Sequence, residues 1–148
     1  MRLLHLTDIH MRQALKGTAD SKERLSRDMP MNLERLEKKL DDWMPDIIVI
    51  TGDLLDVPDG VVDGSLSKTN PEGYQRLVEE SVADYCWMYG WLEATGCDWI
   101  VIPGNHDHRG AFQNVFGVAM PDKNINGWRL IGFDDGLDDV RSPFRPKS

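Results

Sequence analysis

The apolar run Ile100-Val101-Ile102 ends abruptly at Pro103-Gly104, and the polar residues Asn105, His106 and Asp107 follow at once. A short apolar run of this kind is typical of a buried strand in a parallel sheet. In open α/β sheets, ligands bind just outside the carboxyl ends of the strands. The sequence therefore predicts a strand over residues 98–102 and a functional site immediately after it.

Two further apolar runs end in the same way. Residues 2–6 lead to Asp8 and His10, and the β-branched run over residues 47–50 leads to Asp53. The carboxyl ends of parallel strands meet at one edge of a sheet. We therefore expect these three side chains to lie close to the polar groups that follow the third run.

Helical patterns separate the three strands. Asn32 is expected to cap a helix that ends before Pro45, and Asn70-Pro71 predicts the start of a long helix that ends near Gly96. The alternation of strands and helices indicates right-handed βαβ units, and hence an α/β fold with a mostly parallel sheet. The other expected segments are an irregular segment over 11–31, a loop over 56–70, a short helix over 109–116 and a fourth strand over 129–133.

Composition narrows the classes of protein and of partner. A chain of 148 residues is most simply one domain. No apolar run approaches the roughly 20 residues that span a bilayer, and no signal peptide is recognisable, so we expect a cytoplasmic protein without a membrane partner. The formal net charge is −8, from 25 acidic and 17 basic residues. This acidic balance disfavours nucleic acid as a partner, because binding to its phosphate backbone needs clustered Lys and Arg.

The polar groups at the strand ends have the chemistry of metal ligands. Taken alone, Asp8-x-His10 is typical of an ordinary surface and Gly52-Asp53 of an ordinary turn. Together with Asn105 they offer carboxylate oxygens, an imidazole nitrogen and an amide oxygen. This donor set suits Mn²⁺, Fe, Zn²⁺ or Ni²⁺ rather than a metal that prefers sulfur. We therefore expect a divalent metal site, with Mn²⁺ as the first choice.

The same residues carry a family resemblance. Asp8-x-His10, Gly52-Asp53 and Gly104-Asn105-His106-Asp107 resemble, in order and spacing, the first three sequence blocks of the calcineurin-like metallophosphoesterases. The chain looks most like the cyclic-nucleotide and glycerophosphodiester phosphodiesterases of that superfamily. The resemblance implies the N-terminal half of a metallophosphoesterase-type β-sandwich flanked by helices, and a hydrolase that cleaves a small phosphodiester.

Carried over position by position, the resemblance implies four metal ligands, which are Asp8, His10, Asp53 and Asn105. Asp53 would bridge two metal ions, which clamp the phosphate and lower the pKa of a bound water. His106 would contact the scissile phosphate and protonate the leaving oxygen, with Asp107 orienting its ring. His5 is expected to be a core histidine, and His108 either lines the substrate mouth or faces solvent.

The resemblance stops before the family's pattern is complete. The family continues with a Gly-His block and a Gly-His-x-His block, whereas this chain has four histidines, at positions 5, 10, 106 and 108. We therefore expect residues 1–148 to form a single domain that is incomplete at its C-terminus and impaired when alone. It could be part of a longer enzyme, be completed by a homo-oligomer or by a complementary C-terminal half, or be a degenerate metal-binding or assembly module. A DNA repair-type nuclease of the same superfamily is the other alternative.

Overall fold

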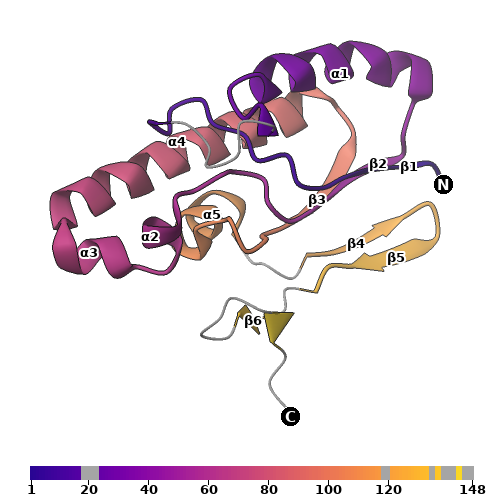
Figure 1. Ribbon diagram of the computed structural model, residues 1–148. Helices are drawn as coiled ribbons and strands as arrows, with labels where there is room; N and C mark the ends of the chain where they lie inside the picture. Colours follow the sequence, from indigo (N-terminus) through magenta and orange to yellow (C-terminus); the bar gives the residue numbers. More distant parts are fainter. Residues whose placement is uncertain (18–23, 118–120, 134–135, 138–142, 145–148) are drawn as a thin grey trace.

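A three-stranded parallel sheet forms the centre of the computed structural model, which describes residues 1–17, 24–117, 121–133, 136–137 and 143–144. Its strands are β1 (Leu3–Leu6), β2 (Ile47–Thr51) and β3 (Asp98–Ile102), with β2 in the middle. Helices α1 (Met29–Trp43) and α4 (Pro71–Ala94) connect them and lie together above the sheet in Figure 1. Two right-handed crossovers that advance in the same direction place their helices on the same face. The α/β prediction is confirmed.

The two faces of the sheet are covered by different elements. Side chains alternate between the faces along each strand, so Ile48 and Ile50 join the large core beneath the helices while Ile47 points to the other side. There Ile47 packs with Ile100 and with Ile125 of a β-hairpin. The hairpin consists of β4 (Asp122–Ile125) and β5 (Trp128–Ile131) and lies below the strands in Figure 1.

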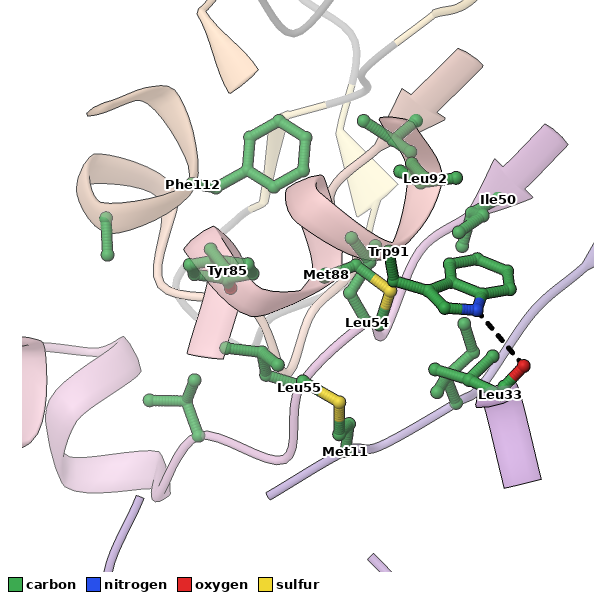
Figure 2. Packing of buried hydrophobic residues seen from close by; sticks show 14 of the residues in the cluster. Met11, Leu33, Ile50, Leu54, Leu55, Tyr85, Met88, Trp91, Leu92 and Phe112 are labelled. Atoms are coloured by element: carbon green, nitrogen blue, oxygen red, sulfur yellow. Dashed lines mark hydrogen bonds between the residues drawn. The ribbon is translucent and has the colours of Figure 1, made fainter. Parts of the chain in front are cut away.

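The long helix α4 supplies much of the main core. Tyr85, Met88 and Leu92 are fully buried on one face, as Figure 2 shows. The indole nitrogen of Trp91 donates a 3.0 Å hydrogen bond to the carbonyl of Leu33, which ties α4 to α1. The predicted start of this helix is confirmed, since the Asn70 side chain accepts a hydrogen bond from the backbone N–H of Gly73.

Two expectations about the elements are wrong. Asn32 lies inside α1, which begins at Met29 with proline in its first turn, where a missing N–H costs nothing. The expected loop over 56–70 contains the short helices α2 (Asp59–Val62) and α3 (Ser65–Thr69), which are too brief to show helical periodicity. The strand expected over 129–133 is present as β5, slightly shifted, and it pairs antiparallel with β4 outside the parallel sheet.

The last described strands, β6 (Gly136–Leu137) and β7 (Pro143–Phe144), form an antiparallel pair. Helix α5 (Arg109–Phe116) follows the third strand as predicted. Among the helices of the described segments, none combines the length and apolar character that a membrane span requires.

Candidate metal centre

Asp8, His10 and Asp53 converge beyond the carboxyl ends of β1 and β2. One ligand atom from each lies within 4.8 Å of the others. The Nε2 atom of His10 is 3.8 Å from Asp8 Oδ1 and 3.8 Å from Asp53 Oδ2. The chain segments remain paired past the strands, because the backbone N–H of His10 donates to the carbonyl of Asp53 at 2.9 Å. The predicted convergence of these three residues is therefore seen in the structure.

All three of these residues have a left-handed backbone. Their φ angles are 54° at Asp8, 49° at His10 and 51° at Asp53. Such angles are uncommon outside glycine and cost about 1–3 kcal/mol where the surrounding structure imposes them. Strained residues of this kind gather at functional sites. The local conformation therefore supports a functional assignment independently of the side-chain chemistry.

The motif glycines let the ends of β2 and β3 approach each other. A Cβ atom on Gly104 would lie 2.2 Å from Asp53 Oδ1 and 2.3 Å from the Asp53 backbone nitrogen. A Cβ on Gly52, whose φ is +90°, would lie 3.0 Å from the Cα of Gly104. Both positions need glycine because the carboxylate of Asp53 and the turn after β3 occupy that space.

The backbone of the third motif fixes the carboxylate of Asp53. The N–H of His106 donates to Asp53 Oδ1 at 2.9 Å, which leaves Oδ2 directed toward His10. The imidazole rings of His10 and His106 also meet edge to face, with 5.0 Å between their centroids. His106 thus lies beside the cluster, with its side chain 22% exposed.

Asp107 lies beneath the cluster and is fully buried. Its carboxylate accepts hydrogen bonds from the N–H groups of Leu54, Leu55 and Gly104 at 3.1, 3.0 and 2.8 Å, and from the Tyr85 hydroxyl at 2.8 Å. Burial raises the pKa of Asp107, and the backbone hydrogen bonds oppose that rise. The described contacts of Asp107 hold the loops after β2 and β3 together. They make it a positioning residue rather than one that touches substrate.

Asp56 is a candidate site residue that was not predicted from the sequence. Its Oδ1 lies 3.7 Å from His10 Nδ1 and 4.0 Å from His106 Nδ1, and its side chain is 3% exposed. Arg12 Nη2 lies 2.9 Å from Oδ2, and Arg24 forms an ion pair with Oδ1. A carboxylate behind a histidine ligand fixes the orientation of the imidazole and raises its basicity.

Little in the sequence indicates a role for Asp56. It follows Asp53 by three positions at the start of a polar segment, which by itself indicates a loop. Its importance comes from burial between two imidazoles, and this depends on the tertiary structure. Asp56, His10 and His106 form a second group with the donor atoms of a metal site.

The imidazole of His10 is suited to bind a metal. Burial lowers its pKa, Arg24 lowers it further, and the carboxylate of Asp53 acts in the opposite direction. A lowered pKa keeps the ring neutral at physiological pH, as a ligand must be. The buried Nδ1 faces Asp56 without a hydrogen bond, and Nε2 faces the two carboxylates. The residues present therefore fit a divalent cation held by nitrogen and oxygen donors.

The remaining predicted residues have different placements. Asn105 is half-buried in the turn between β3 and α5, and its role as a metal ligand stays a prediction. His5 is exposed rather than in the core, with Nε2 2.6 Å from the Thr51 hydroxyl, because it points away from the helices.

His108 caps helix α5 rather than joining the cluster. Its Nδ1 accepts a hydrogen bond from the N–H of Ala111 at 3.0 Å, so Nε2 carries the proton that it donates to Tyr74 Oη at 3.1 Å. Burial lowers the pKa of His108, in keeping with this neutral form.

Comparison with known proteins agrees with this geometry. One similar protein is a "probable cyclic nucleotide phosphodiesterase" from Synechococcus sp., 32% identical over 94 residues. That alignment covers 61% of this chain and 28% of the relative, so the chain spans less than a third of the relative's length. The model of the calcineurin-like phosphoesterases matches residues 1–145, which is nearly the whole chain. The chain therefore belongs to the calcineurin-like phosphoesterase family.

Proposed function

We propose that this chain carries the metal-binding and phosphate-binding residues of a metal-dependent phosphodiesterase that hydrolyses a small phosphodiester. The observation that supports this most is the convergence of Asp8, His10 and Asp53 within 4.8 Å, with His106 beside them. Because the Synechococcus relative is described as a probable cyclic nucleotide phosphodiesterase, a cyclic nucleotide is the first physiological substrate to test.

The ligands divide between two metal positions in this proposal. Asp8 and His10 would hold the first ion, Asp53 would be shared between the two ions, and Asn105 would contribute its amide oxygen to the second. Divalent ions, with Mn²⁺ as our first choice, would stabilise charge on the phosphoryl oxygens and lower the pKa of a bound water. Fe, Zn²⁺ and Ni²⁺ suit the same donors.

His106 serves the leaving group in this proposal. Its ring borders the cluster and is partly open to solvent, so a substrate oxygen can reach Nε2. The opposite nitrogen, Nδ1, faces the buried carboxylate of Asp56, which orients the ring. In the proposed reaction the ring would be protonated at Nε2 when substrate is bound, and that proton would pass to the departing oxygen.

The test is hydrolysis of bis(p-nitrophenyl) phosphate with Mn²⁺, comparing wild type with Asp53→Ala. Loss of the bridging carboxylate should lower turnover by about 100-fold or more, because both metal positions depend on it. Asp98→Ala is the matched control, since Asp98 lies at the opposite end of the sheet, where it pairs with Lys123 at 2.9 Å. Equal turnover by wild type and Asp53→Ala would exclude phosphodiesterase activity for this chain.

A further inference from the structure

Arg24 reaches the site from the segment between β1 and α1. Its Nη1 forms an ion pair with Asp56 Oδ1, and its Nη2 lies 3.4 Å from His106 Nε2. A guanidinium has no acceptor atom, so in this structure the contact makes Nε2 of His106 the acceptor, and the contact would be released when Nε2 is protonated for the leaving oxygen. Arg24 is therefore located at the nitrogen of His106 that faces the substrate in the proposed function.

The guanidinium of Arg24 is anchored on one side and open on the other. The side chain of Asp56 is 3% exposed, whereas that of Arg24 is 27% exposed. A guanidinium carries five N–H donors in a rigid planar fork. With Nη1 held by the buried carboxylate, N–H groups of Nη2 remain on the open side of the site beside His106.

The segment that carries Arg24 is stabilised by other residues. Arg27 donates to the carbonyls of Gln13, Leu15 and Gly17 at 2.9, 2.5 and 2.7 Å. The described contacts of Arg24 reach instead to Asp56 and His106, which belong to the loops after β2 and β3. Arg24 thus serves the site, while Arg27 serves the fold of the loop.

We propose that Arg24 binds the phosphoryl oxygens of the substrate and of phosphate at the His106 side of the metal cluster. This inference rests on the proposed function. The carboxylates of Asp8 and Asp53 repel the negative charge of a phosphate, and a fixed arginine beside them offsets that repulsion. Arginine suits the task because its fork matches two phosphate oxygens and stays charged at any physiological pH.

The experiment is calorimetric titration of inorganic phosphate into the Mn²⁺-loaded chain. Arg24→Gln should weaken phosphate binding by about tenfold or more, because a charge-assisted hydrogen-bond pair is lost. Arg24→Lys keeps the charge without the fork and should fall between Arg24→Gln and wild type. Arg76→Gln is the charge-matched control, since Arg76 is a 68% exposed side chain on α4, and it should change the affinity by less than about twofold.

Two further measurements decide among the outcomes. Mn²⁺ titration of Arg24→Gln should give an affinity within about threefold of wild type, which shows that phosphate rather than metal binding has changed. If Arg24→Gln binds phosphate as tightly as wild type, the inference is overturned. The proposed function is tested separately, by the Asp53→Ala assay. If Arg24→Gln does not fold, Arg24→Lys decides, and unaltered phosphate affinity there overturns the inference. A wild-type chain that hydrolyses the diester but binds no phosphate overturns the inference alone.

Discussion

The buried pair of Asp107 and Tyr85 shows how one residue controls the position of the site. Tyr85 is fully buried, and its pKa is raised well above its ordinary value by burial and by Asp107, so the hydroxyl stays protonated and donates to the carboxylate. Tyr85→Phe removes one charge-assisted hydrogen bond and should lower the free energy of unfolding by about 1.5–3 kcal/mol near pH 7. Urea denaturation measures this loss, with Tyr89→Phe, a partly exposed tyrosine one turn later, as the control.

The pH dependence of this loss follows from the pKa of Asp107. Burial raises that pKa in the folded state, so stability from this group is fully present below the unfolded-state pKa and is lost as the pH rises through the folded-state pKa. The Tyr85 hydrogen bond lowers the same pKa and so favours the ionised form in the folded state. The penalty of Tyr85→Phe should therefore be larger near pH 7 than at acidic pH, where Asp107 is protonated. A penalty that grows in acid would contradict this account.

At the scale of elements, helix α4 stabilises the loop that follows the first motif. The Asp84 carboxylate, 1% exposed, accepts hydrogen bonds from the N–H groups of Gln13, Ala14 and Leu15 at 3.0, 2.6 and 3.1 Å. Asp84→Ala leaves these donors without their partner, so it should lower the free energy of unfolding by about 2–4 kcal/mol. It should also speed hydrogen exchange at these amides, measured by NMR. Glu79→Ala, at an exposed position on α4, is the control; similar exchange in both variants would contradict the role of Asp84.

The elements also show which parts of the structure the sequence can predict. The three strands of the parallel sheet could be predicted, because local apolar runs and glycines define them. They are the strands that precede Asp8, Asp53 and His106. The positions of Asp56 and Arg24 could not, because each lies in a polar segment whose order comes from contacts distant in sequence. Arg24 and Asp56 are 32 positions apart, and no local pattern reports that pairing.

At the scale of the whole molecule, the sheet has one well-covered face and one partly covered face. The β4–β5 hairpin packs on Ile47 and Ile100, yet Leu3 on β1 remains 45% exposed and Trp128 on β5 61% exposed. The helix-covered face was predictable from the βαβ alternation, which determines where crossover helices lie. The hairpin was not predictable, because β4 (Asp122–Ile125) carries little apolar sequence and, among the described strands, pairs with β5 alone.

The candidate ligands among the described residues lead to a prediction about the number of bound metal ions. In the proposed function the first position would use the carboxylates of Asp8 and Asp53 and the imidazole of His10, which converge in the structure, whereas the second would share Asp53 and add Asn105. Two protein donors hold a divalent ion weakly, so the chain alone should bind one Mn²⁺ tightly in calorimetry. A saturating concentration near 100 Kd should stabilise the folded state by about 2.7 kcal/mol, seen as a rise in Tm that chelation reverses. Asp8→Ala should abolish both the tight Mn²⁺ binding and the rise in Tm, whereas Asp98→Ala should keep both. Two tight sites in a species with the mass of a monomer would show that this chain completes the second position by itself.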